Sequence, residues 1–220
     1  MTELGAAIAS YWEAASPAFD TEPDHGLRDP RTRDAWRARL RRWIPSGPCD
    51  VLDAGCGTGS LALLLAEDGH RVTGVDLAPG MVARAEEKFA AAGVPGRFLV
   101  GDAARPPVGE ERFDVVLVRH VVWTLPDPGA ALRAWTGLLR EGGLLVMVEG
   151  RWGEAGGDVT PYVPGGEALP WGGGVSARAL AGAVAPLAGD VRVERLDGDP
   201  ALWGRAVSDE RYAVLASARA

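Results

Sequence analysis

The sequence predicts an α/β protein with a doubly wound, mostly parallel sheet that ends in a C-terminal antiparallel hairpin. From residue 49 onward, short apolar runs rich in Val and Leu alternate with helical patterns. The runs are apolar on both faces, which is typical of parallel strands covered by helices on both sides. Strands that alternate with helices form βαβ units, and these units build a doubly wound sheet.

The first 48 residues are predicted to form a helical lid or cap segment, and residues 49–220 the main domain. Within the first segment, Trp36, Leu40, Trp43 and Ile44 share one helix face, which we expect to pack against the sheet. Seven arginines between residues 28 and 42 are interpreted as the solvated face of that helix.

The elements follow in order along the chain. Strands are predicted at residues 49–54, 71–76, 97–100, 113–118 and 144–149, with helices at 60–67, 79–92 and 128–139 between them. The third helix should begin at the N-cap Asp127 and end at Gly142-Gly143. A stretch rich in glycine and proline, residues 150–175, is predicted to be a functional or mobile loop. A helix at 177–187 and a hairpin of strands 191–196 and 211–216 complete the chain.

Composition excludes several classes of protein. The net charge of −7 and the pI of about 5.0 disfavour a nucleic-acid partner. The apolar runs are too short for a membrane span, and the N-terminus does not read as a signal peptide, so we expect a cytoplasmic protein. Cys49 and Cys56 are interpreted as reduced thiols. The three histidines are scattered along the chain, and no metal is expected; a homodimer is left open.

A glycine-rich turn follows the first strand and carries the functional argument. The pattern Asp53-x-Gly55-x-Gly57-x-Gly59 stands directly before a helix. Glycines allow a sharp bend and a close approach to a ligand, and the helix behind them offers free N–H groups. Ligands of doubly wound sheets bind at the carboxyl ends of the strands, so a nucleoside-like ligand is predicted. Gly57-x-Gly59-x-x-Ala62 also fits the loose dinucleotide fingerprint, which keeps an NAD(P)-dependent oxidoreductase as an alternative.

Three further motifs narrow the choice. Asp76 ends the second strand, Gly101-Asp102-Ala103 follows the third, and Phe113-Asp114-Val115-Val116 opens a fourth strand that leads into Arg119-His120. Over residues 50–150, the order and spacing of these motifs resemble those of class I S-adenosylmethionine-dependent methyltransferases, which have a Rossmann-like fold. The resemblance implies S-adenosyl-L-methionine as cofactor, S-adenosyl-L-homocysteine as product, and no metal.

The same resemblance implies roles for individual residues. Gly55, Gly57 and Gly59 would cradle the amino-acid part of the cofactor, with Asp53 beside them as a contact or only as a turn-stabilising acceptor. Asp76 would hold the ribose, Leu77 and Met81 would lie beside the adenine, Asp102 and Ala103 would bind the adenine edge, and Arg119 and His120 would line the sulfonium region.

The N-terminal stretch resembles the opening of quinone-type and small-molecule methyltransferases, in which this segment lids the cofactor. The resemblance rests on Tyr11-Trp12 and Phe19-Asp20 and implies that Tyr11 and Phe19 are cofactor or lid contacts. Simple packing of an N-terminal helix is the alternative.

Candidate catalytic groups lie just downstream. Glu22 and Asp24 flank His25, and we expect a neighbouring carboxylate to raise the pKa of that imidazole and fix its tautomer. His25 is the first candidate base, with Glu22 beside it and Tyr11 as a donor partner; an exposed acidic turn is the alternative. His120 is the second candidate, and a structural hydrogen bond is its alternative.

The acceptor is predicted to be a small, aromatic molecule. Trp12, His25, Trp123, Arg151 and Trp152 are the predicted substrate residues, because aromatic rings stack on planar ligands. The whole chain resembles compact actinobacterial methyltransferases, some of which methylate indoles, including tryptophan-derived cyclic dipeptides. This resemblance implies C- or N-methylation of an indole. A quinone- or phenol-type acceptor and a cofactor-binding module without transfer are alternatives.

Overall fold

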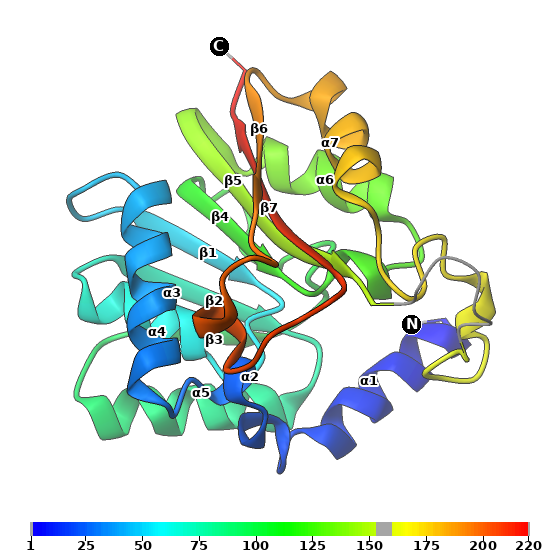
Figure 1. Cartoon of the computed structure of the whole chain (residues 1–220), viewed down its shortest axis with the longest axis horizontal. Coiled ribbons are helices and arrows are strands. Elements are labelled where there is room, and N and C mark those ends of the chain that lie inside the picture. Colours follow the sequence, from blue (N-terminus) through cyan, green and yellow to red (C-terminus); the bar gives the residue numbers. More distant parts are fainter. Residues whose placement is uncertain (1, 153–159, 220) are drawn as a thin grey trace.

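The computed structural model describes residues 2–152 and 160–219, which form one central sheet with helices on both faces (Figure 1). Within these residues the sheet has seven strands in the order β3-β2-β1-β4-β5-β7-β6. The strands are β1 Asp50–Ala54, β2 Arg71–Asp76, β3 Arg97–Val100, β4 Phe113–Arg119, β5 Leu139–Arg151, β6 Val191–Arg195 and β7 Glu210–Ser217. The first five pair in parallel, and β7 runs antiparallel to both β5 and β6. The predicted fold class is therefore confirmed, including the antiparallel β6–β7 pair.

The structure contains helices at the positions predicted for 60–67, 79–92, 128–139 and 177–187, together with short ones such as Pro200–Trp203 that the sequence analysis did not predict. The helices are α1 Glu3–Ala15, α2 Pro23–Gly26, α3 Pro30–Trp43, α4 Ser60–Glu67, α5 Pro79–Ala92, α6 Pro128–Gly137, α7 Ala177–Val184 and α8 Pro200–Trp203. Proline at the first helical position and a side-chain cap start several of them; Asp127, for example, accepts a hydrogen bond from the backbone N–H of Ala130 at 2.8 Å.

Two apolar clusters lie on opposite faces of the sheet. Helices α3, α4 and α5 cover one face, and α6 and α7 cover the other (Figure 1). Trp36 and Trp43 of α3 are buried in the first cluster, as predicted. Because α3 belongs to this core, only the residues before it lie apart as a cap.

Several basic residues of α3 form ion pairs as well as facing solvent. Arg33 and Arg37 form ion pairs with Glu67 at the end of α4, and Arg37 and Arg41 form ion pairs with Asp68. These pairs offset part of the positive charge of the arginine cluster, and the Arg41 side chain stays 63% exposed.

One predicted boundary is wrong. Helix α6 ends at Gly137, where the backbone N–H of Leu138 closes the last turn, and Gly142-Gly143 lie within β5 instead of ending the helix. The strand register shifts between Phe113 and Val115, and Gly142, at φ +71°, lies in the part of β5 that this irregularity accommodates.

The N-terminal helix lies beside the segment that follows the undescribed residues. Figure 1 shows α1 next to this segment, and Ile8 of α1 packs with Val163 and Leu169 in a small third cluster, separate from the two core clusters. Of the predicted glycine-rich loop, residues 153–159 lie outside the described part of the chain. Cys49 and Cys56 are free and buried. In the ranges described here, no helix has the length and hydropathy required to cross a bilayer.

Candidate active site

A cavity of about 1170 Å³ opens at the carboxyl ends of the parallel strands. Asp53 at the end of β1, Asp76 at the end of β2 and Arg119 at the end of β4 all line it. Strand order reverses between β1 and β4, which is where doubly wound sheets bind their ligands. Pockets for single drug-sized ligands measure roughly 300–1,000 Å³, so this cavity has room for a nucleoside-like molecule and a second small one.

The predicted glycine turn forms one wall. The backbone N–H groups of Gly55 and Cys56 both donate to the carbonyl oxygen of Val75, which fixes the turn against β2. Gly55, Gly57 and Gly59 have φ values of +80°, +52° and +74°. A Cβ at Gly55 would overlap the Cγ2 atom of Val121, so glycine is required there for space as well as for backbone conformation.

Asp76 braces the same turn from β2. Its carboxylate accepts hydrogen bonds from the backbone N–H groups of Gly57 at 2.9 Å and Ala78 at 3.0 Å. Burial raises the pKa of Asp76, and these N–H groups oppose the rise. Each carboxylate oxygen still has a second lone pair, so the group can accept ribose hydroxyls while it holds the turn.

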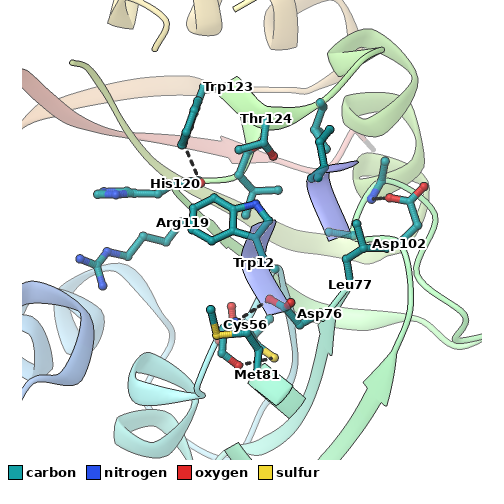
Figure 2. A pocket seen from close by; sticks show the side chains of 18 of the residues that line it. Trp12, Cys56, Asp76, Leu77, Met81, Asp102, Arg119, His120, Trp123 and Thr124 are labelled. Carbon is teal, nitrogen blue, oxygen red and sulfur yellow. Dashed lines mark hydrogen bonds between the residues drawn. The ribbon is translucent and has the colours of Figure 1, made fainter. Parts of the chain in front are cut away.

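The remaining cofactor candidates also line the cavity. They are Asp53, Leu77, Met81, Asp102 and Ala103. Burial, with Asp76 nearby, raises the pKa of Asp53 to about 7. Asp102 caps the following turn by accepting a hydrogen bond from the backbone N–H of Ala104 at 2.8 Å, and it faces the cavity as well. Figure 2 shows Leu77 and Asp102 on one side of the cavity and Arg119 and His120 on the other.

Aromatic side chains from the cap cover the cavity. Trp12 of α1 lies over Asp76 (Figure 2), and its ring meets those of Phe19 and Trp123 edge-on, at centroid separations of 6.2 and 6.4 Å. The Phe19 ring lies against the glycine turn, because a Cβ at Gly57 would be 3.2 Å from it.

Three predicted site residues do not line the cavity: Tyr11, Gly59 and Arg151. Gly59 packs against α5 instead, because a Cβ at this position would be 2.9 Å from the Cβ of Ala85. Tyr11 is 42% exposed and packs edge-on against Trp12 and Tyr162, so the donor role expected of its hydroxyl has no support in this geometry. Arg151 is exposed, whereas its neighbour Trp152 lines the cavity. Because successive strand residues point to opposite faces, the end of β5 presents only one of this pair to the site.

Asp24 and Glu22 do not produce the net rise in the pKa of His25 that the sequence predicts. Asp24 forms an ion pair with Arg119 at 2.9 Å, and its nearer oxygen is 3.9 Å from His25 Nε2. Burial, followed by the positive charge of Arg119, lowers the pKa of His25, and these effects outweigh Asp24 and Glu22, which raise it. The predicted rise is therefore wrong, because burial and then the charge of Arg119 outweigh the carboxylates. Glu22 lines the cavity, as predicted for a site residue.

His120 lies beside His25 although 95 positions separate them. The two ring centroids are 6.5 Å apart, and the ring of His120 is 4.6 Å from that of Trp152. Burial and the charge of Arg119 lower the pKa of His120 well below 6.5. Both imidazoles are thus neutral at pH 7 and available to accept a proton.

The histidines are not all scattered, which corrects the sequence interpretation. Asp24, His25 and His120 each place one ligand atom within 4.8 Å of the others, a spacing that suits a metal ion. However, Arg119 already donates to Asp24 and supplies the positive charge that a metal would bring. The absence of a metal stays a prediction.

Glu149 lies behind the cavity and supports a turn that lines it, and the sequence interpretation gave it no role. It ends the apolar core of β5, is fully buried, and accepts hydrogen bonds from the backbone N–H groups of Val121 at 2.9 Å and Val122 at 2.7 Å. It thereby fixes the turn after His120, which itself has φ +57°. Burial raises the pKa of Glu149 to about 8. In the sequence, this role is indicated by a single carboxylate at the end of an otherwise apolar strand.

Comparison with known proteins finds methyltransferases that are similar to part of this chain. Residues 52–147 match the family model described as a methyltransferase domain. A demethylmenaquinone methyltransferase of Thermus thermophilus is 38% identical over 117 residues, 52% of this chain and 53% of that protein. A ubiquinone biosynthesis O-methyltransferase of Xanthomonas axonopodis pv. citri is 36% identical over 146 residues, 64% of this chain and 57% of that protein. The chain thus spans a little over half the length of these curated relatives.

Among solved structures, magnesium protoporphyrin IX methyltransferase from Synechocystis PCC 6803 with bound S-adenosylhomocysteine superposes with a TM-score of 0.72. It is 17% identical, and the match covers 99% of this chain and 100% of that one, so it shows the fold.

The residues present fit S-adenosylmethionine. The glycine turn leaves no room for a Cβ at Gly55, the Asp76 carboxylate has lone pairs free, and the buried Nε of Arg119 has no protein partner among the described residues. Residues 52–147 thus resemble a methyltransferase domain, within a fold that a solved methyltransferase shares.

Proposed function

We propose that this chain transfers a methyl group from S-adenosylmethionine to a small aromatic molecule. The observation that carries the proposal is a single cavity with two unlike walls. One wall is the glycine turn with Asp76, and the other combines tryptophan rings with two neutral imidazoles. The acidic net charge of −7 argues against a nucleic-acid acceptor.

The first wall would bind the donor. Gly55, Gly57 and Gly59 would approach its amino-acid part, Asp76 its ribose, and Asp102 its adenine. When bound, S-adenosylmethionine supplies an activated methyl group on a sulfonium. The chain itself would mainly orient the two molecules and exclude water, which is catalysis by proximity. The cap residues Trp12 and Phe19 cover this part of the cavity and would exclude the water.

The second wall would bind the acceptor. Trp12, Trp123 and Trp152 offer faces and edges for a planar ring, and His25 and His120 would take the proton that the acceptor loses. An indole, such as that of a tryptophan-derived cyclic dipeptide, suits this wall, because its ring supplies the nucleophilic carbon or nitrogen. C- or N-methylation would follow.

A quinone- or phenol-type acceptor is the second candidate. It is favoured by the names of the similar proteins, a demethylmenaquinone methyltransferase and ubiquinone biosynthesis O-methyltransferases. A phenol would present its O–H to the same imidazoles, and the reaction would be O-methylation.

The experiment compares donors first and acceptors second. Calorimetry should detect binding of S-adenosylhomocysteine and none of NADH, which separates the proposal from an oxidoreductase. Incubation with methyl-labelled S-adenosylmethionine then compares a tryptophan cyclic dipeptide with a catechol. Label in the dipeptide supports the indole acceptor, and label in the catechol supports the second candidate. Binding of the donor without transfer to either aromatic class, across a panel of each, would count against a transferase of aromatic molecules.

A further inference from the structure

We propose that Lys88 is a positioning residue that holds the cap, residues 2–27, closed over the glycine turn. The inference rests on the proposed function only in taking the cavity beneath the cap as the cofactor site. Lys88 is the only lysine in the sequence. It lies on α5, outside the lining of the cavity, and its contacts all run to the cap and the turn.

Three oxygens surround the Lys88 ammonium group. Its Nζ lies 3.0 Å from Asp20 Oδ2, 3.1 Å from Thr58 Oγ1 and 2.7 Å from Ser60 Oγ. Thr58 in turn donates its hydroxyl to the other oxygen of Asp20 at 2.5 Å. Asp20 belongs to the cap, whereas Thr58 and Ser60 belong to the turn and the start of α4. One ammonium group therefore joins three segments that are distant in sequence.

Polar contacts hold the middle of the cap, around Asp20, beside the glycine turn. Besides Asp20, Glu13 accepts a hydrogen bond from the backbone N–H of Gly80 at 2.7 Å, and Asp24 pairs with Arg119. The apolar contacts of the cap lie towards its two ends: α1 packs in the small third cluster, and Leu27 is buried in the first core cluster. Between these ends, the Phe19 ring is the apolar group that meets the glycine turn, and the contacts of Asp20 fix the backbone beside it.

Asp20 sets the positions of two functional rings. Phe19, the residue before it, lies against Gly57 of the turn, and its ring stacks on the imidazole of His25. The side chains of Asp20 and Lys88 are only 15% and 21% exposed. Loss of Lys88 would leave the Asp20 carboxylate with a hydroxyl partner but no counter-ion, and a partly buried charge in that state moves towards water. Phe19 and His25 would move with it.

The proposal predicts faster loss of cofactor when the ion pair is broken. Lys88→Met keeps the unbranched shape and most of the length of the side chain and removes its charge, and Asp20→Asn removes the charge of its partner. Each should raise the dissociation rate constant of S-adenosylhomocysteine about tenfold, equivalent to ~1.4 kcal/mol. The double variant should resemble either single variant, because both remove the same interaction. Glu87→Gln, an exposed charge on the same helix, is the control and should change nothing.

Chemical modification gives a second readout that does not need a ligand. Because Lys88 is the only lysine, an acetylating reagent reports on one side chain, which peptide mapping separates from the N-terminal amine. Acetylation should be slow in the wild type and about tenfold faster in Asp20→Asn, an effect of about 1.4 kcal/mol on opening. Hydrogen exchange of residues 2–27 should accelerate in both single variants, while exchange in β1 and β4 stays unchanged.

The outcomes separate this inference from the proposed function. If S-adenosylhomocysteine binds but leaves all variants at the wild-type rate, the ion pair does not hold the cap and the inference is overturned, whereas the cofactor assignment stands. If it does not bind the wild type at all, the proposed function fails, and acetylation and exchange still decide the role of Lys88. A fall in thermal stability without faster exchange in residues 2–27 would mean a general structural role and would also overturn the inference.

Discussion

The Phe19 ring stacks on the His25 imidazole, with ring centroids 4.3 Å apart and 12° between the planes. The same ring lies against Gly57 of the glycine turn. One cap residue therefore touches both the proposed cofactor wall and a proposed base, so closure of the cap and orientation of the imidazole are coupled.

Replacement of Asp76 should weaken cofactor binding specifically. Asp76→Ala removes the acceptor of the Gly57 and Ala78 N–H groups as well as the proposed ribose contact. We expect S-adenosylhomocysteine affinity to fall about 100-fold, because a hydrogen bond to a charged group contributes ~1.5–3 kcal/mol. Calorimetry measures this directly. Asp102→Ala, which leaves the glycine turn intact, should lose less; an equal loss would contradict the bracing role of Asp76.

Gly55→Ala tests whether the turn requires space or only backbone freedom. Gly55 and Gly93 both have positive φ, at +80° and +67°, so alanine at either position costs ~1 kcal/mol or more of unfolding free energy. A Cβ at Gly93 meets nothing within 4 Å, whereas one at Gly55 overlaps Val121. Denaturant titration should show the larger loss for Gly55→Ala, and only this variant should lose cofactor affinity. Equal effects of the two substitutions would rule out the close contact.

The pH dependence of turnover should reflect neutral histidines. The pKa values of His25 and His120 are both lowered from 6.5, chiefly by burial. The rate should therefore be flat above pH 6.5 and decline only at lower pH, where the bases become protonated. His25→Ala should lower kcat about 100-fold or more, the usual contribution of a general base. Full turnover by this variant, with loss in His120→Ala, would transfer the role to His120.

Glu149 should make the folded state less stable as pH rises. Its pKa is about 8 in the folded protein and about 4.5 when exposed, so the folded state retains a proton that the unfolded state releases between these values. The unfolding free energy should fall across pH 4.5–8, at up to ~1.4 kcal/mol per pH unit. Glu149→Gln keeps an oxygen acceptor for Val121 and Val122 and should lack this slope. Denaturant titrations of both proteins at pH 5 and pH 8 provide the measurement; parallel slopes would refute the assignment.

Removal of divalent metals should leave activity unchanged. The Arg119 guanidinium already occupies the carboxylate of Asp24 that a metal would need. Turnover measured after dialysis against a chelator should equal that of untreated protein, and added Zn²⁺ or Co²⁺ should not restore or raise it. A Co²⁺ absorption band that disappears in His25→Ala would show instead that the cluster with His120 binds metal.

The elements of this fold are predictable because their signals are local. Asp127-Pro128 starts α6 where the sequence places it, and the glycines after β1 mark the cofactor turn. The misplaced end of α6 has a physical cause. A glycine pair reads equally well as a helix stop or as an irregularity in a strand, and only pairing of Leu139 with Phe113 decides between them.

The candidate site is predictable only in part, because its acceptor side depends on contacts that no local pattern contains. His25 and His120 meet through the packing of the cap on the sheet, and burial together with Arg119 reverses the pKa shift expected from Asp24. Lys88 belongs to no sequence motif, and its proposed role rests on three oxygens that two segments distant in sequence, the cap and the glycine turn, bring to its ammonium group.

Strand order reverses between β1 and β4, and the two walls of the cavity come from different parts of the sequence. The wall proposed to bind the methyl donor comes from one continuous stretch, residues 53–103. The wall proposed to bind the acceptor is assembled from the cap and from segments after β4. Recombination or directed evolution can therefore replace the proposed acceptor-binding segments while residues 53–103 stay unchanged. Under the proposed function, a change of substrate then leaves the binding of the methyl donor unaltered.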